Sequence, residues 1–265
     1  MTIVSCIGSP RKNGNTARAA ALLVEELRSA ARTRDVDLTV DTVFLSDLRI
    51  ELCRGCRACF DRGEDHCPHH DDLPTLRDKL LHADGVILSS PVYVNDVSGT
   101  MKNVIDRLAF TCHRPTFQKV AACFLATTGS SPMRHTLRTL QGAWLSMGGP
   151  GRNTVGLKTG ALSTQNEIKR IHARRINRLA QHFFIAIEEK AYEKAGFASL
   201  LIFCIQQKSW YRISKKKGET LDSMYWLSQG WFDRRCTFFV PHRASPLKVV
   251  AARALGTFLS FVFSR

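Results

Sequence analysis

Short apolar runs alternate with amphipathic helical segments over the first 190 residues, and this alternation is the feature that most constrains the fold. Five runs are typical of strands, at residues 2–7, 36–45, 85–90, 120–129 and 154–158. The segments between or after them repeat apolar residues at helical spacing, at 16–34, 72–83, 100–110, 131–148 and 164–189. Strands that alternate with helices predict an α/β fold with a doubly wound, five-stranded parallel sheet, because right-handed crossovers cover both faces.

Three loops follow predicted strands and carry unusual residues, at 8–16, 90–98 and 127–132. In open parallel sheets a ligand binds outside the carboxyl ends of the strands, where the strand order reverses. We therefore expect these loops to form one binding site. The first loop, GSPRKNGNT, is typical of a phosphate-binding turn, but Asn15 stands where nucleotide-hydrolysing loops have a lysine.

Four of the nine cysteines are bunched within fifteen residues, namely Cys53, Cys56, Cys59 and Cys67. The spacing C-x2-C-x2-C, the fourth cysteine and the proline directly after it are similar to the ligand runs of 4Fe-4S clusters. One alternative is zinc, with His66, His69 and His70 as further ligands. Another is plain or redox-active thiols that only shape the loop, and the residues leave all three interpretations open.

The formal net charge is +15, and the last 75 residues carry +8 of it, as 12 Lys or Arg against 4 Asp or Glu. A basic surface suits phosphorylated cofactors, anionic membranes or nucleic acid. No recognisable nucleic-acid module accompanies the charge, so we expect no nucleic-acid partner. The chain starts with an apolar strand rather than a basic lead and a long apolar segment, which predicts a cytoplasmic protein with reduced cysteines.

Residues 191–265 depart from the alternating pattern and are predicted to form a basic, aromatic C-terminal extension to a domain of residues 1–190. Within the extension, the apolar run Ala198–Gln206 is typical of an additional strand. The last predicted element is an amphipathic helix over 247–263. Ser245 and the proline after it directly precede this helix and are typical of a helix start.

This last helix is apolar except for one narrow stripe of Arg253, Thr257, Ser260 and Ser264. It falls short of the roughly 20 apolar residues that span a bilayer. We therefore expect 246–264 to pack on a partner subunit or to make peripheral membrane contact, helped by basic clusters at 215–217 and 234–235.

Three motifs, in this order, resemble the flavodoxin-like NADPH-dependent FMN reductases: GSPRKNGNT, then CRGCRAC with Cys67 and Asp71-Asp72, then SSPVYVNDVSGTMKNVIDR. Within that group the chain is most similar to the branch that includes the iron-sulfur flavoproteins. The resemblance covers residues 1 to about 190 and implies a flavodoxin-like fold, bound FMN and a homodimer or higher oligomer. It also implies Cys53, Cys56, Cys59 and Cys67 as ligands of a 4Fe-4S cluster.

The resemblance assigns each loop to a part of FMN. A ribityl phosphate is held rather than transferred, so helix N-terminal N–H groups, hydroxyls and one guanidinium suffice, and the first loop offers Ser9, Arg11, Asn13, Asn15 and Thr16. An ordinary turn with Asn15 or Thr16 as N-cap is the alternative. The loop around the isoalloxazine ring carries over to Pro91, Val92, Tyr93, Val94 and Asn95. The third side of the flavin is expected at Thr127, Thr128 and Gly129.

The implied function is an FMN-dependent NAD(P)H oxidoreductase that passes hydride to FMN and then reduces a quinone, a nitro or azo compound, flavin, a metal ion or a redox protein. The alternative is a non-enzymatic electron-transfer flavoprotein with a 4Fe-4S cluster, reduced by ferredoxin. A third interpretation is a regulatory flavoprotein. Because the flavin carries the chemistry, we name no catalytic side chain. Lys102, Asp106 and Arg107 also match the family, but we interpret them as structural residues of a charged helix.

Overall fold

The structure, a computed structural model, describes residues 1–161 and 163–263. Five parallel strands form one sheet in the order β2-β1-β3-β4-β5. The strands are β1 (Thr2–Ile7), β2 (Thr39–Phe44), β3 (Gly85–Pro91), β4 (Ala121–Thr128) and β5 (Gly151–Lys158). The predicted doubly wound, flavodoxin-like sheet is confirmed, and its strand order reverses between β1 and β3.

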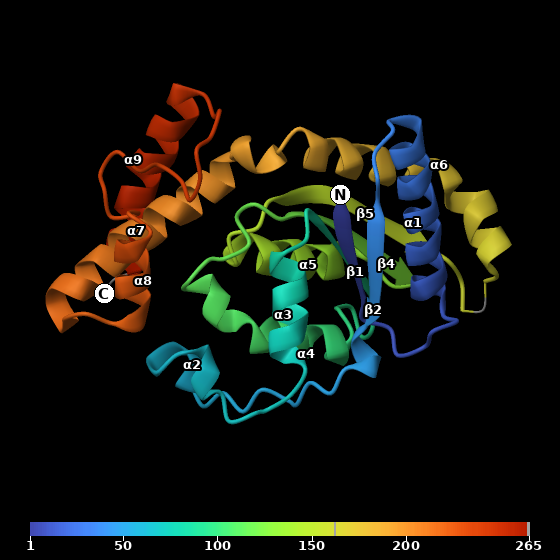
Figure 1. The fold of residues 1–265 in the computed structure, drawn as a ribbon, viewed down its shortest axis with the longest axis horizontal. Coiled ribbons are helices and arrows are strands. Elements are labelled where there is room, and N and C mark those ends of the chain that lie inside the picture. The colour runs from blue at the N-terminus through green and yellow to red at the C-terminus, as the bar shows by residue number, and fades with distance from the viewer. Residues whose placement is uncertain (162, 264–265) are drawn as a thin grey trace.

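Helices cover both faces of the sheet, with α1 and α6 on one face and α3, α4 and α5 on the other (Figure 1). The α-helices are α1 (Asn15–Thr33), α2 (Ala58–Asp61), α3 (Leu73–Leu81), α4 (Gly99–Arg107), α5 (Arg134–Ser146), α6 (Gln165–Glu188), α7 (Phe197–Lys217), α8 (Leu221–Ser228) and α9 (Pro246–Phe263). Short 3-10 helices are η1 (Leu45–Asp47), η2 (Glu64–His66), η3 (Ala109–Cys112) and η4 (Ala191–Glu193).

The sheet is sandwiched between two apolar layers. Leu23 and Leu27 of α1 pack with Ile87 and Phe183 on one side, and Met101 of α4 packs in the cluster on the other side. Strands β3 and β4 are buried along their whole length. Burial on both faces explains why these two strands are continuous rather than alternating apolar runs.

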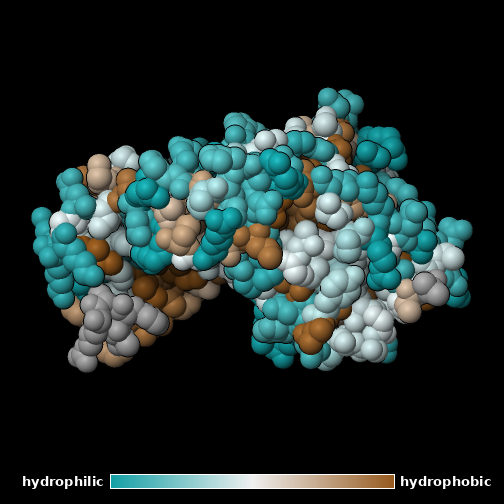
Figure 2. Space-filling model, turned by 90° about the horizontal axis from the view of Figure 1, so that it is seen from below, coloured by the Kyte–Doolittle hydropathy of each residue, from teal (hydrophilic) through white to brown (hydrophobic). Residues whose placement is uncertain are grey.

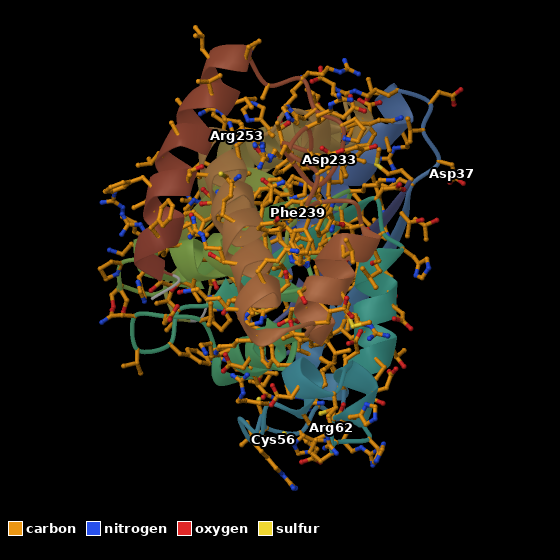
Figure 3. All side chains as sticks on the ribbon, turned by 90° about the vertical axis from the view of Figure 1, so that its left-hand side faces the viewer. Asp37, Cys56, Arg62, Asp233, Phe239 and Arg253 are labelled. Atoms are coloured by element: carbon orange, nitrogen blue, oxygen red, sulfur yellow. The ribbon has the colours of Figure 1, made fainter. Side chains whose placement is uncertain are left out.

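The extension is helical, and the predicted strand over Ala198–Gln206 is wrong, because these residues lie inside α7. An apolar run of this length fits a buried strand and a buried helix equally well. Here α7 is packed by α8 and α9, and its Phe203 lies in an aromatic cluster with ring centroids 4.8–6.3 Å apart. The other rings of this cluster are Trp226, Trp231, Phe238 and Phe239, the last labelled in Figure 3. Because the cluster is separate from the two layers on the sheet, we propose a division near residue 190.

The extension, at the left of Figure 1, packs against residues 112–115 at the end of η3. Gln206 Nε2 donates to the Cys112 carbonyl at 2.8 Å, Trp226 Nε1 donates to the His113 carbonyl at 2.8 Å, and Tyr225 donates its hydroxyl proton to the Pro115 carbonyl at 2.5 Å. This contact lies next to the cysteine loop rather than beside the carboxyl ends of the strands.

Candidate functional site

The loops that follow β1, β3 and β4 meet at the carboxyl edge of the sheet, as predicted. The Gly8 N–H donates to the Ser89 carbonyl at 2.8 Å, and the Ser98 hydroxyl donates to the Gly8 carbonyl at 2.6 Å. The Val92 N–H donates to the Thr127 carbonyl at 2.8 Å. The three loops therefore surround one place, at the reversal of strand order between β1 and β3.

The loop over residues 8–16 leaves the N-terminus of α1 open to an anion. Gly14 is the N-cap and has no side chain to cap the helix. The N–H groups of Asn15, Thr16 and Ala17 in the first turn therefore lack intrahelical acceptors. The alternative interpretation, with Asn15 or Thr16 as the N-cap, is wrong, because Gly14 occupies that position. Aligned N–H groups at a helix N-terminus bind phosphate well.

Gly8 is required for this geometry. A Cβ at this position would lie 2.9 Å from both Met101 Cβ and Ser98 Oγ, so a larger residue would push β1 away from α4. Ser9 is buried, and its Oγ accepts the Arg11 N–H at 3.3 Å, which closes the turn. The Arg11 and Asn13 side chains are exposed around the turn. This arrangement fits a phosphate of the FMN type, held by backbone, hydroxyl and guanidinium groups.

Two of the predicted phosphate ligands use their side chains elsewhere. Asn15 Nδ2 donates to Thr159 Oγ1 at 3.0 Å and to the Gly160 carbonyl at 2.7 Å. The buried Thr16 and Thr127 hydroxyls share a hydrogen bond of 2.6 Å. These contacts tie the first loop to β4 and to the loop after β5, and they leave the backbone N–H groups of both residues for a ligand.

The loop after β3 ends in a tight turn. The Tyr93 N–H donates to the Asp96 carbonyl at 2.8 Å, and the Asp96 N–H donates to the Tyr93 carbonyl at 3.1 Å. Val94 and Asn95 both have positive φ, at 48° and 67°, which is the pattern of a type I′ turn. Tyr93 and Val94 are exposed at the tip, whereas Pro91, Thr127 and Thr128 are buried at the strand ends and Gly129 is exposed.

Val94 is strained, because a β-branched residue rarely adopts positive φ. We expect Val94→Asn to raise the free energy of unfolding by about 1 kcal/mol, since asparagine tolerates this region. Urea denaturation of the two proteins measures the change. Val92→Asn in the same loop, where φ is not positive, is the matched control and should not stabilise. Equal effects at both positions would contradict the strain argument.

The four predicted cysteines line one cavity of about 420 Å³. Cys53 and Cys56 are exposed, and Cys59 and Cys67 are partly buried. Burial, and then the negative charges of Cys67 and Cys53, raise the pKa of the Cys59 thiol. The cavity is also lined by charged residues of both signs, Arg54, Arg57, Arg77 and Arg107 with Glu64, Asp65, Asp71 and Asp106. Figure 3 places Cys56 at the lower edge of the molecule.

The donor set agrees in kind with an iron-sulfur cluster, which takes four thiolates as ligands, because four cysteines line this one cavity. Among residues 1–161 and 163–263, no three His, Cys, Asp or Glu side chains are grouped closely enough to hold one metal ion.

Helix α4 connects the cysteine cavity to the loops at the carboxyl edge of the sheet. Asn103 Oδ1 accepts the Cys53 N–H at 3.2 Å, and Arg107 Nη2 donates to Cys67 Sγ at 3.7 Å. The N-cap of the same helix is Ser98, whose hydroxyl donates to the Gly8 carbonyl. Arg107 is nine positions after Ser98, which is about 13 Å along the helix axis. One rigid element therefore positions both candidate sites.

Arg107 forms a buried ion pair with Asp71, with side-chain exposures of 3% and 0%. Its Nη1 donates to Asp71 Oδ2 at 2.6 Å and to the Glu51 carbonyl at 2.7 Å. Burial acts to raise the pKa of Asp71, but hydrogen bonds from Arg107 and from backbone N–H groups outweigh it and lower that pKa. The structural interpretation of Arg107 is thus supported, as is that of Lys102 and Asp106, which form an exposed pair.

Arg114, which the sequence analysis did not single out, joins the cysteine loop to the extension. Its buried guanidinium donates to Asp222 Oδ1 in α8 at 2.5 Å, to the Cys59 carbonyl at 2.6 Å and to Glu64 at 3.2 Å. The residues that it joins are more than 150 positions apart in sequence, so no local pattern could reveal it. The extension therefore supports one wall of the cysteine cavity.

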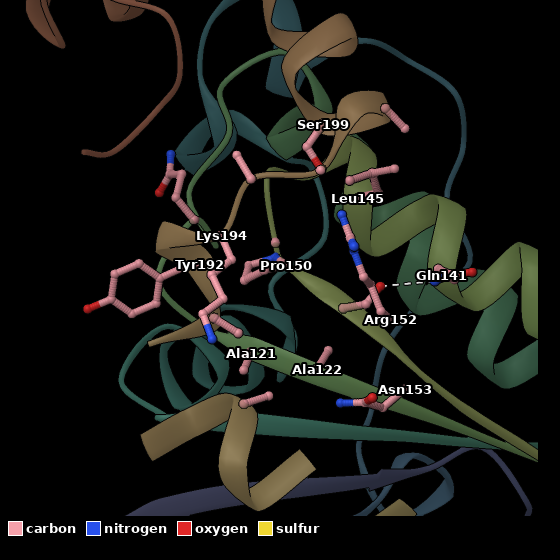
Figure 4. Close-up of a pocket in the computed structure, with 18 of the residues that line it drawn as sticks. Ala121, Ala122, Gln141, Leu145, Pro150, Arg152, Asn153, Tyr192, Lys194 and Ser199 are labelled. Atoms are coloured by element: carbon pink, nitrogen blue, oxygen red, sulfur yellow. Dashed lines mark hydrogen bonds between the residues drawn. The ribbon is translucent and has the colours of Figure 1, made fainter. Parts of the chain in front are cut away.

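A second cavity, of about 670 Å³, lies at the amino ends of β4 and β5 (Figure 4). Ala121 and Ala122 form its floor, and Arg152, Lys194 and Ser199 line its walls from β5 and the extension. A hydrogen bond of 3.0 Å from Gln141 Nε2 to the Gly151 carbonyl crosses its edge. It opens at the end of the sheet opposite to the three loops, so it is distinct from the candidate flavin site.

Comparison with known proteins identifies a family and relatives of this chain. The family model described as NADPH-dependent FMN reductase matches residues 1–161. An iron-sulfur flavoprotein of Archaeoglobus fulgidus is 36% identical over 118 residues, which are 44% of this chain and 50% of that protein. An iron-sulfur flavoprotein of Clostridioides difficile is 28% identical over 192 residues, covering 72% of this chain and 81% of the relative. The chain thus spans about half the length of the first of these relatives.

Among solved structures, the chain is similar to the NAD(P)H:quinone oxidoreductase from Methanothermobacter marburgensis. The TM-score is 0.53 at 16% identity, covering 69% of this chain and 96% of that one. At this identity the similarity establishes the fold alone, and it agrees with the observed strand order.

Proposed function

The chain belongs to the NADPH-dependent FMN reductase family, and from this premise we propose that it is an FMN-dependent oxidoreductase that takes hydride from NAD(P)H and reduces a second acceptor. The observation that carries the proposal is the convergence of three loops on the open N-terminus of α1. When bound, FMN supplies hydride acceptance at its reactive ring and onward electron transfer. The protein supplies binding, orientation and access.

Each loop has a separate task in this proposal. The first-turn N–H groups of α1, with Ser9 and Arg11, hold the phosphate. The turn at 93–96 would hold the isoalloxazine ring, with Tyr93 as its aromatic residue. Thr127 and Thr128 would close the remaining side through β4, where the Thr127 hydroxyl shares a hydrogen bond with the Thr16 hydroxyl. The proposal needs no general acid or base from the protein.

We further propose that Cys53, Cys56, Cys59 and Cys67 hold a 4Fe-4S cluster, which supplies one-electron transfer when bound. The cavity that the four cysteines share supports this assignment. An electron-transfer flavoprotein reduced by ferredoxin is therefore the second candidate function, favoured by the placement of both sites on α4. Quinones, nitro or azo compounds, free flavin and redox proteins are the acceptor classes, and a homodimer or higher oligomer is the proposed assembly.

One experiment tests both candidates: an absorbance spectrum of anaerobically purified protein, with an iron assay, before and after addition of NADPH or NADH. We expect a flavin spectrum that bleaches with a nicotinamide, and a broad underlying absorbance with about four irons per chain. Reduction by ferredoxin with negligible nicotinamide oxidation would instead support the electron carrier. A protein that binds no flavin, even after reconstitution, would refute both functions.

Two cysteine substitutions test the cluster separately from the flavin. Cys59→Ser should abolish the broad absorbance and most of the iron and leave the flavin band. Cys112→Ser, a partly buried cysteine outside the cavity, should change neither. Iron-free, purely yellow wild-type protein would contradict the cluster and leave the flavin proposal intact.

A further inference from the structure

Helix α9 turns its apolar face outward. Leu247, Phe258 and Phe261 are exposed by 83%, 67% and 60%, and Val250 and Leu255 are exposed as well. At 100° per residue these five positions, with Ala251 and Ala254, fall on one side of the helix. Figure 2 shows apolar side chains gathered on the extension, at the left of the view. An isolated exposed leucine is ordinary, but a face of this length marks a contact surface.

The polar stripe of α9 points into the extension. Arg253 Nη1 donates to the Cys236 carbonyl at 3.2 Å, and Figure 3 shows Arg253 on the side toward Asp233 and Phe239. Thr257 Oγ1 lies 3.9 Å from Cys204 Sγ of α7, and Ser260 is buried. A Cβ at Gly256 would lie 2.8 Å from Cys204 Cβ, so the helices are in close contact on this side. Ser264, the last residue of the predicted stripe, lies outside the described residues.

Basic groups flank the outward face. The sequence of α9 contains no Asp or Glu, and Lys248 is exposed in its first turn. The guanidinium of Arg212 in α7 lies 3.9 Å from the centre of the Phe261 ring. The exposed residues Lys215, Lys216 and Lys217 follow at the end of the same helix. This end of α9 is therefore both apolar and strongly positive.

We propose that the outward face of α9 docks the protein on an anionic lipid bilayer, with its large apolar residues in the interface and the flanking lysines among the headgroups. An apolar face with basic edges is the pattern of helices that lie in the plane of a membrane. No helix among the described residues is long and apolar enough to cross a membrane. A second copy of the chain fits less well, because α9 contains no Asp or Glu that could pair with the basic residues of a second α9.

The test uses the full-length protein and vesicles of phosphatidylcholine with or without phosphatidylglycerol, and it measures cosedimentation at low and high salt. We expect binding to the anionic vesicles at low salt and much weaker binding to neutral ones or at high salt. Phe258→Glu should lower the partition coefficient about tenfold or more. Ile171→Glu, at a similarly exposed position on α6, is the matched control and should bind like the parent protein.

The charged edge is tested separately. Lys216→Gln and Lys217→Gln should each lower binding to anionic vesicles about fivefold and leave binding to neutral vesicles unchanged. Failure of the parent protein to sediment with anionic vesicles at low salt would overturn the proposal. So would binding by Phe258→Glu at the parent's affinity. A dimer that Phe258→Glu dissociates, without vesicle binding by the parent, would assign the face to a second copy. None of these readouts depends on flavin or on activity.

Discussion

Replacing Arg107 by methionine is expected to lower the free energy of unfolding by about 3–5 kcal/mol, because Asp71 is left as an unpaired charge in a buried position. The loss extends beyond one ion pair. Arg107 also donates to the Glu51 carbonyl and to Cys67 Sγ, so its removal frees the start and the end of the cysteine loop together. Urea denaturation followed by circular dichroism measures the change.

Helix α4 offers a matched control for this prediction. Lys102 pairs with Asp106 on the exposed side of the same helix, so Lys102→Met should cost less than about 1 kcal/mol. The double variant Arg107→Met/Asp71→Leu should recover part of the loss, since no buried charge remains. Recovery stays incomplete because Asp71 also accepts the N–H groups of Glu51 and Leu73. Equal costs for Arg107→Met and Lys102→Met would contradict the argument.

The same pair predicts a dependence on pH. Burial acts to raise the pKa of Asp71, and the hydrogen bonds that it accepts outweigh burial, so the pKa is lower in the folded protein than in the unfolded chain. A carboxyl of this kind stabilises the fold above its unfolded pKa, near 3.9, and loses that contribution as the pH falls through its folded pKa. The difference in the free energy of unfolding between the parent protein and Arg107→Met should therefore have its full size at neutral pH. It should become smaller below about pH 4.

Patterns along the chain predicted the first 190 residues well, because their structure depends on local periodicity. The five strands, the helices between them and the meeting of the three loops all follow from alternation, strand burial and the rule that carboxyl ends share one edge. The start of α6 was also predictable, since Thr164 and Glu167 form a capping box.

The remaining features depend on contacts between distant residues. The run within α7 was predicted as a strand because its periodicity does not distinguish buried strands from buried helices. The polar stripe of α9 was identified, but whether it faces water or protein is decided by Cys204 and Cys236 on other segments. Arg107 and Arg114 each join segments that are far apart in the chain. A charged residue on a helix carries no local sign of its buried partner.

FMN should bind at least about 100-fold more tightly than riboflavin, which lacks the phosphate. Two charge-assisted hydrogen bonds, each of about 1.5–3 kcal/mol, account for that ratio. The first turn of α1 offers more than two N–H groups, and Arg11 adds an exposed guanidinium. Quenching of flavin fluorescence by the flavin-free protein measures both affinities.

Arg11→Ala distinguishes binding of the FMN phosphate from binding of the isoalloxazine ring. It should weaken FMN binding about tenfold and leave riboflavin binding unchanged, because only FMN carries the dianion that the proposed function assigns to the guanidinium. Lys12→Ala is the matched control, since Lys12 is the next residue and already pairs with Asp47 at 2.8 Å, so both flavins should keep their affinity. If riboflavin and FMN bound equally, the loop over 8–16 would be a plain turn. The flavin would then have to be held by the loops after β3 and β4 alone.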